Sequence, residues 1–350
     1  MQEAAQQLDQ APADEQVADP PLHLDLAPDR GRAAPAPAVF PPPAAQAAPR
    51  TGHAEVRAHH GEIVQGMFYS PDGTLEHGLV TLPCPLFATR ARFRPSPTGP
   101  LTVEPGDRQR ARTAARMTLD ALGRPGWGGA LRIEGDVPLR WGCGSSTTDV
   151  LSTILAVADA FGRTLPPEWI ARISVASESA SDSLMYGPER AVLFAQRRGC
   201  VLQDLGGPLP VVRVLGFNTE TDRGVETLAL PPCRYSAWEA EAFGPILGTL
   251  RRAVDRQDPV LLGRVATAST RIMQRHRPKR AMPQMLALAR EVGALGVQVA
   301  HSGTVAGFLF DPGPGTARRM EQARAGLRRL GLERSWEFTT DLSPRPEPVA

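Results

Sequence analysis

The chain has 350 residues, of which 42% are hydrophobic, and its formal net charge is +2. This length allows one large domain or two medium ones with cores of their own, and the balanced charge argues against a basic nucleic-acid binder or a binder of anionic membranes. Lys279 is the only lysine, so a cation that contacts phosphate must be an arginine, a helix N-terminus or a metal ion.

The residues 1–50 are dominated by Ala, Pro, Gln and Asp, and 342–350 are rich in Pro. Such segments bury too little apolar surface to offset the entropy of ordering them, so we expect two disordered tails. A Gly-Gly-Pro sequence at 206–208 marks a boundary. We therefore expect an N-terminal ATP-binding domain at 51–207 and a C-terminal domain at 208–341.

The segments 54–58, 78–81, 89–93 and 131–134 predict short strands between glycines and prolines. A strong helix follows the last of them, and a second helix begins at Pro167, a residue suited to a first helical turn. Further strands are expected at 211–217, 297–300, 305–310 and 336–339, and further helices at 237–254, 259–276, 283–295 and 316–330. Because the strands occur in clusters rather than in regular βα units, the pattern favours an α+β fold of two domains.

A glycine-serine loop connects the strand at 131–134 to the strong helix, and it reads Gly142-Cys143-Gly144-Ser145-Ser146-Thr147. Glycines allow the backbone to approach a phosphate closely, and the first N–H groups and the dipole of the helix favour an anion there. A Walker A loop is excluded because no lysine precedes the serines. An ordinary helix start, with Ser or Thr as the N-cap, explains the loop as well as phosphate binding does.

Four segments together resemble the motifs of the GHMP kinase superfamily, in the family order. The loop and Pro138 resemble the second motif. His-Gly-Glu-Ile-Val-Gln-Gly at 60–66 resembles the first motif, and Ala-His-Ser-Gly-Thr-Val-Ala-Gly at 300–307 resembles the third. Ser-Asp-Ser at 181–183 resembles a further conserved segment. These forms are similar to the L-threonine kinase branch, although Trp141 stands where that branch has a lysine.

The resemblance implies a two-domain α+β fold that binds ATP and a small acceptor between the domains. It also implies transfer of the γ-phosphoryl group of ATP, with Mg²⁺, to a hydroxyl group. In the L-threonine kinase branch the product is O-phospho-L-threonine, a precursor of the cobalamin side arm. The implied ATP-binding residues are those of the loop: Gly142, Cys143, Gly144, Ser145, Ser146 and Thr147.

The other site residues follow from the same resemblance. Asp182 is the candidate catalytic carboxylate, which either accepts the proton of the acceptor hydroxyl or orients that hydroxyl and holds the metal. Ser146 and Glu178 are candidate Mg²⁺ ligands, because Mg²⁺ prefers hard oxygen ligands. The candidate acceptor-binding residues are Glu62, Gln65, His301, Ser302, Gly303 and Thr304. A structural role is the alternative for each: a turn for Asp182, a solvated helix face for Glu178 and a helix cap for Glu62.

Three hypotheses for function remain at this point. The first is an L-threonine kinase, the second is a GHMP-type kinase for another small alcohol, and the third is a non-catalytic ATP-binding regulatory protein. Four cysteines without a Cys-x-x-Cys pair argue against a zinc site or disulfides. No stretch approaches the roughly 18 apolar residues of a membrane span. We therefore expect a cytoplasmic protein without nucleic-acid or membrane partners, and a homodimer is one candidate assembly.

Overall fold

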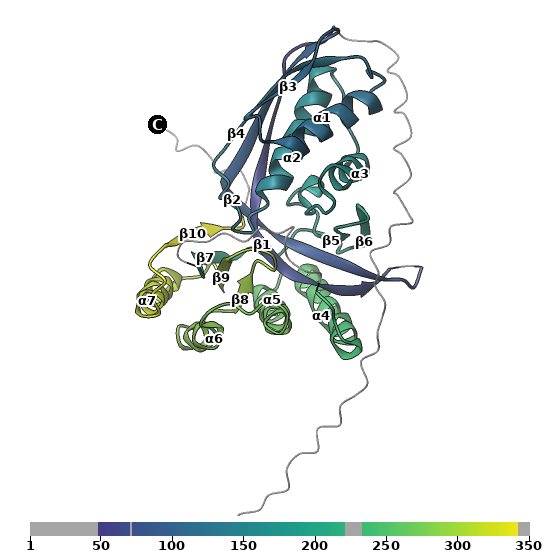
Figure 1. Cartoon of the computed structure of the whole chain (residues 1–350). Coiled ribbons are helices and arrows are strands. Elements are labelled where there is room, and N and C mark those ends of the chain that lie inside the picture. Colours follow the sequence, from purple (N-terminus) through teal and green to yellow (C-terminus); the bar gives the residue numbers. More distant parts are fainter. Residues whose placement is uncertain (1–47, 71, 221–232, 342–350) are drawn as a thin grey trace, which may run out of the picture.

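The computed structural model describes residues 48–70, 72–220 and 233–341, so most of both expected tails lies outside the described residues. In these residues ten strands form one sheet, eight of them in the order β10-β7-β9-β8-β1-β2-β4-β3 (Figure 1). β5 pairs with β2, and β6 pairs with β5. The strands are β1 (Gly52–Tyr69), β2 (Leu75–Ser96), β3 (Leu101–Glu104), β4 (Gly128–Gly135), β5 (Val192–Ala195), β6 (Cys200–Asp204), β7 (Arg213–Asn218), β8 (Gly296–Val299), β9 (Val305–Phe310) and β10 (Ser335–Thr339).

β1 and β2 are two long antiparallel strands that run through both halves of the molecule (Figure 1). The expectation of separate short strands at 54–58, 78–81 and 89–93 was wrong. The ladder between β1 and β2 shifts register three times between Arg57 and Val64, and Pro83 and Pro85 lie inside β2. Bulges and prolines break the regular alternation by which a long strand is recognised.

In the upper half of Figure 1, one face of the sheet is covered by three helices: α1 (Gln109–Ala121), α2 (Ser145–Ala160) and α3 (Pro167–Glu178). α2 packs on β1 and β2, and α1 and α3 pack on α2. The predicted starts of α2 and α3 are confirmed. α1, β3 and β6 were not predicted. α1 is rich in arginine, and its buried face consists mostly of alanines, so the helix carries few of the large apolar residues by which a buried face is usually recognised.

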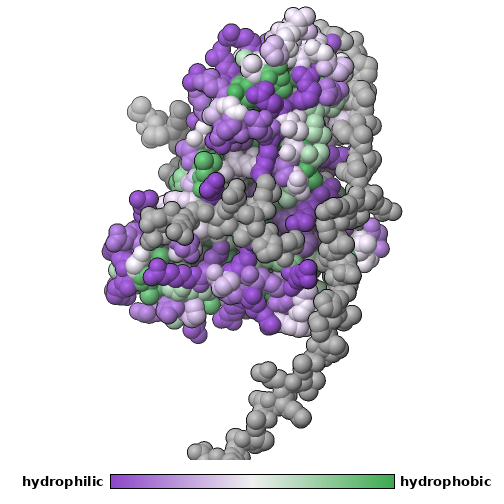
Figure 2. All heavy atoms as spheres, viewed as in Figure 1, coloured by the Kyte–Doolittle hydropathy of each residue, from purple (hydrophilic) through white to green (hydrophobic). Residues whose placement is uncertain are grey.

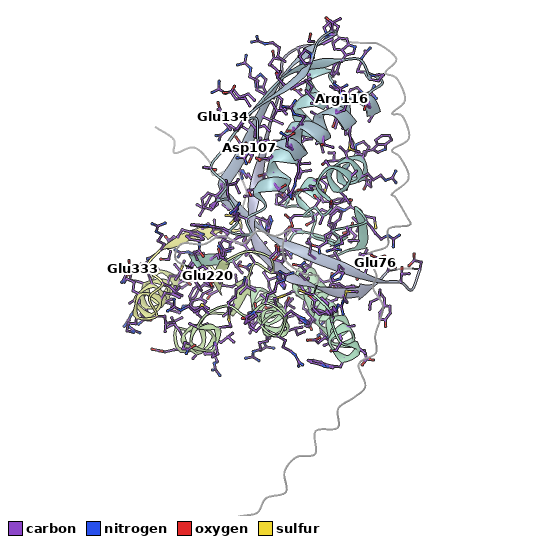
Figure 3. The ribbon with its side chains drawn as sticks, viewed as in Figure 1. Glu76, Asp107, Arg116, Glu134, Glu220 and Glu333 are labelled. Carbon is purple, nitrogen blue, oxygen red and sulfur yellow. The ribbon has the colours of Figure 1, made fainter. Side chains whose placement is uncertain are left out.

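The lower half contains α4 (Ala237–Arg256), α5 (Pro259–Met273), α6 (Met282–Glu291) and α7 (Thr316–Arg329). α5 packs on β8 and β1, and α6 packs against α7 and β8. The side-chain view places Glu76 at the lower end of the long hairpin and Arg116 on the helices above it (Figure 3). The predicted α+β fold is therefore confirmed, with a mostly antiparallel sheet shared by the two halves.

A small apolar cluster lies where the two halves meet, and it contains Ala58, Val137, Cys143, Ala300 and Val305. On the face shown in Figure 2, hydrophilic residues dominate and hydrophobic residues occur in small groups. None of the described helices is long and apolar enough to cross a bilayer. The site described next is built on loops that converge above the small apolar cluster.

Candidate active site

The first motif lies on the irregular part of β1. Gly61 has φ +65°, and a Cβ at this position would lie 2.3 Å from the side-chain amide nitrogen of Gln298. Bulges re-aim side chains and are frequent next to active sites. Here the irregularity places two polar groups, His59 and Glu62, on the same buried side of the site as Asp182, and their nearest ligand atoms lie within 4.8 Å of one another.

The glycine-serine loop leads directly into α2, whose N-cap is Gly144 in the left-handed conformation, φ +76°. No side chain caps this helix, so the N-cap role considered for Ser or Thr is not observed. The unpaired N–H groups of the first turn therefore remain available to an anion. A Cβ on Gly144 would lie 2.5 Å from the His59 ring, which shows how closely the loop packs on the first motif.

The third motif packs against the same loop. Thr304 and Val305 donate backbone hydrogen bonds to the carbonyl of Trp141, at 2.9 and 3.1 Å. A Cβ on Gly303 would lie 2.1 Å from that carbonyl oxygen. Trp141 itself stacks on Trp336, with ring centroids 5.6 Å apart. The second and third motifs thus form one rigid unit in which Trp141 has a packing role.

Glu178, the last residue of α3, reaches the start of α2. Its carboxylate accepts hydrogen bonds from Ser146 at 2.8 Å, Thr147 at 3.1 Å and Ser174 at 3.1 Å. Burial raises the pKa of Glu178 to about 7. Among the residues that the structure describes, no basic side chain pairs with it. A buried carboxylate without a cation, next to the Ser146 hydroxyl, fits the oxygen ligand set of Mg²⁺.

Asp182 follows α3 and faces His59 across 123 positions of sequence, with Oδ2 2.9 Å from His59 Nε2. The other ring nitrogen of His59 lies 3.1 Å from the Gly61 carbonyl oxygen. Burial lowers the pKa of His59, but the charge and hydrogen bond of Asp182 outweigh it and raise the pKa to about 9. Burial raises the pKa of Asp182, but His59 and the Thr147 hydroxyl hold it below its usual value. Asp182 is therefore an ionised carboxylate held in place from two sides.

A second polar group lies beside this pair. Glu62 accepts hydrogen bonds from the backbone and the ring of His301, at 2.9 and 3.0 Å. His301 also contacts the Ser269 hydroxyl at 3.2 Å, and the backbone of Gln65 donates to the same hydroxyl at 3.3 Å. Glu62, Gln65 and His301 are thus joined in one network, whereas Ser302 is half-buried beside it. The Gly303 carbonyl accepts a bond from Lys279.

Comparison with known proteins agrees with this arrangement. Residues 109–187 match the GHMP kinases N terminal domain. The chain is 25% identical over 264 residues to the L-threonine kinase of Salmonella typhimurium, covering 74% of this chain and 82% of that enzyme. It is 30% identical over 192 residues to the L-threonine kinase of Citrobacter freundii, covering 51% of this chain and 61% of that enzyme.

Two homoserine kinases extend the comparison. The chain is 28% identical over 244 residues to the enzyme of Moorella thermoacetica, covering 65% of this chain and 78% of that enzyme. The crystal structure of homoserine kinase from Cytophaga hutchinsonii superposes with a TM-score of 0.62 at 16% identity, covering 84% of this chain and 96% of that one. This chain is similar to GHMP kinases in sequence and in fold. The resemblance expected from the four motifs is confirmed.

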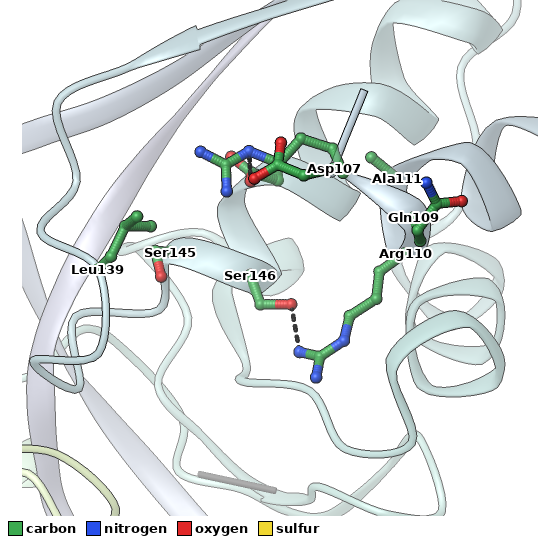
Figure 4. Close-up of a pocket in the computed structure, with 9 residues that line it drawn as sticks. Asp107, Gln109, Arg110, Ala111, Leu139, Ser145 and Ser146 are labelled. Carbon is green, nitrogen blue, oxygen red and sulfur yellow. Dashed lines mark hydrogen bonds and ion pairs between the residues drawn. The ribbon is translucent and has the colours of Figure 1, made fainter. Parts of the chain in front are cut away.

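The candidate active site includes residues that the sequence did not reveal. His59 precedes the motif segment by one residue. A hollow of about 260 Å³ opens at the start of α2 and is lined by the β3–α1 connection (Figure 4). Its lining comprises Asp107, Arg108, Gln109, Arg110, Ala111, Leu139, Ser145, Ser146 and Asp149. Since α1 was not predicted, its contribution to the candidate active site could not be predicted either.

Cys143 belongs to the glycine-serine loop, but its side chain does not line the hollow. Its side chain is buried in the small apolar cluster, and burial raises the pKa of its thiol. Its backbone carbonyl accepts a long bond, 3.4 Å, from the His59 amide. Cys143 therefore contributes its backbone to the loop and its side chain to packing.

The His59–Asp182 pair predicts that the stability of the folded protein depends on pH. The folded-state pKa of His59 is about 9, above the ordinary value of about 6.5. The stabilisation that the His59–Asp182 ion pair contributes is therefore complete below pH 6.5 and is lost as the pH rises through 9. In urea unfolding, we expect the stability difference between wild type and His59→Gln to shrink by on the order of 2 kcal/mol between pH 6.5 and 9.5.

The neighbouring His60 supplies the control. It is buried, and burial lowers its pKa to about 4, so it stays neutral over this whole range. The stability difference between wild type and His60→Gln is expected to change by less than about 0.5 kcal/mol from pH 6.5 to 9.5, because only the unfolded-state ring titrates near that range. A change as small as this for His59→Gln would contradict the ion pair.

Proposed function

We propose that the protein transfers the γ-phosphoryl group of ATP to the hydroxyl of a small amino acid, and that L-threonine is the acceptor. The observation that carries the proposal is the convergence of Glu178 and Asp182 on the first turn of α2, where Ser146 and Thr147 join them. Phosphoryl transfer requires positioning and charge neutralisation more than covalent chemistry. An uncapped helix N-terminus beside two carboxylates supports both requirements.

The division of labour between the two carboxylates follows from their surroundings. Asp182 is held ionised by His59, so we assign it to the acceptor hydroxyl, whose proton it accepts or whose oxygen it orients. Glu178 and Ser146 are assigned to Mg²⁺. When bound, the metal ion supplies charge neutralisation to the phosphate oxygens. The uncapped N–H groups at the start of α2 are assigned to the triphosphate of ATP.

The acceptor is assigned from charges next to Asp182. Glu62 is buried, and only one of its carboxylate oxygens is used by His301, so it suits an ammonium group. Lys279 is half-buried at Gly303, and the Glu62 charge acts on it. An acidic and a basic side chain in this part of the site would complement the ammonium and carboxylate groups of an amino acid. Two curated relatives are L-threonine kinases and one is a homoserine kinase, so homoserine is the second candidate acceptor.

The test is an acceptor screen that measures ADP release by the full chain with ATP and Mg²⁺. L-threonine, L-homoserine, L-serine, mevalonate and galactose are compared with an acceptor-free control. We expect L-threonine to give the highest kcat/KM and O-phospho-L-threonine to appear in step with ADP. A higher kcat/KM with L-homoserine would reassign the acceptor. ADP release no higher than in the acceptor-free control, with every compound, would reject the kinase and favour an ATP-binding regulatory protein. The cytoplasmic location and the homodimer remain expectations.

A further inference from the structure

We propose that Arg110 is the cation of the nucleotide site, and that its guanidinium binds the terminal phosphates and so makes the site prefer ATP to AMP. This inference rests on the proposed function. It names a residue outside the four motifs, on a helix that the sequence did not predict. Three observations support it. The loop has no cation at the phosphate position, the side chain of Arg110 contacts the loop, and the neighbouring arginines already interact with other groups of the protein.

The glycine-serine loop has no basic side chain that faces the phosphate position. Trp141 is stacked on Trp336. Arg140 is exposed, and it is not among the residues that line the hollow. Lys279, the only lysine of the chain, is bonded to the Gly303 carbonyl. A helix N-terminus offers only about half a positive charge, which is small against the several negative charges of a triphosphate.

Arg110 supplies a full charge at the required place. It is the second residue of α1, and its side chain extends across the hollow to α2 (Figure 4). Its Nη1 atom donates to the Ser146 hydroxyl at 2.7 Å. The same hydroxyl donates to Glu178 at 2.8 Å. The guanidinium therefore lies beside the oxygen ligands assigned to Mg²⁺, which is where the β- and γ-phosphates are expected.

The neighbouring arginines on this helix start are already used. Arg108 forms an ion pair with Asp149 at 3.2 Å, and Arg112 donates to the Leu101 carbonyl at 2.8 Å. Arg110 forms no ion pair with the rest of the described chain; its bond is to the neutral Ser146 hydroxyl. A guanidinium in this state can exchange a neutral acceptor for a phosphate oxygen, which it binds in a stronger, often bidentate geometry.

The experiment measures binding of AMP, ADP and ATP to the full chain by isothermal titration calorimetry with Mg²⁺. Arg110→Ala is compared with wild type, with Arg110→Lys and with two controls. Arg140→Ala removes the loop arginine, and Arg112→Ala removes the next arginine of α1. We expect Arg110→Ala to weaken ATP binding by about 10- to 100-fold and to leave AMP binding unchanged. Arg110→Lys should recover part of the loss, and both controls should match wild type.

Several outcomes would overturn the assignment. Arg110→Ala could bind ATP like wild type, or it could lose AMP and ATP binding equally, or Arg140→Ala could carry the loss instead. Circular dichroism and thermal unfolding establish that each variant is folded. If wild type releases ADP with an acceptor while Arg110→Ala binds ATP normally, the Arg110 assignment alone fails. If wild type binds no nucleotide, the proposed function and this inference fail together.

Discussion

Replacing Asp182 with asparagine is expected to lower kcat for phosphoryl transfer by roughly 10²- to 10⁴-fold, with nucleotide affinity unchanged. The amide side chain would keep the shape of the carboxylate but would lose the negative charge that accepts or orients the hydroxyl proton. Asp182 contacts the loop through the Thr147 hydroxyl at 3.2 Å and not through the backbone N–H groups of the helix start. The substitution therefore leaves those N–H groups available to ATP. Steady-state ADP release and ATP titration measure the two quantities separately.

A matched control for this substitution is Asp204→Asn. Asp204 is an exposed carboxylate on β6 that pairs with Arg190 at 2.8 Å, and it lies outside the hollow and the motifs. Its loss should leave kcat within about twofold of wild type, as surface ion pairs contribute little, roughly 0 to 1 kcal/mol. An Asp182→Asn enzyme with wild-type kcat would remove Asp182 from the mechanism.

Replacing Glu178 with glutamine is expected to have the second largest effect, and it should change activity and stability in opposite directions. The neutral amide would be a poorer ligand for Mg²⁺, so kcat should fall by about 100-fold and the Mg²⁺ concentration required should rise. The folded-state pKa of Glu178 is about 7, above its ordinary value of about 4.3. Ionisation of Glu178 therefore costs stability as the pH rises from about 4.3 to about 7, and the full cost persists above that range.

Without Mg²⁺ at pH 8, Glu178→Gln should consequently unfold at a higher temperature than wild type. Addition of Mg²⁺ and ATP should stabilise wild type more than the variant, because ligands that bind the folded state raise its stability. Glu168→Gln is the control, since Glu168 is exposed in the first turn of the same helix. A variant that is less stable than wild type at pH 8 would show that Glu178 is a structural residue.

The parts of the site that depend on local chemistry could be predicted from the sequence. The glycine loop and the starts of α2 and α3 follow from short-range signals, such as Pro167 at a first helical turn. The motifs indicated Ser146 and Asp182, and Glu178 was added as a carboxylate near the end of the helix before Asp182; the structure places the three together. Their assigned roles stay predictions until they are tested.

The remaining parts depend on contacts between distant positions. The approach of His59 to Asp182 requires the register shifts of β1, which no local pattern indicates. The place of Arg110 requires α1, which was not predicted because its buried face consists mostly of alanines. Long strands interrupted by Pro83 and Pro85 were divided into short ones for the same reason: alternation is a signal only while the register is regular.

The position of β1 in the sheet has a consequence for how the chain folds. β1 is the first strand of the described residues, yet it lies in the middle of the sheet and pairs with β8. The contact between Glu62 and His301 spans 239 positions. During synthesis, Glu62 of the first motif therefore cannot form this contact until His301, near the end of the chain, has been made. Contacts of such high sequence separation form slowly, so we expect the candidate active site to be among the last regions to gain protection from hydrogen exchange during refolding.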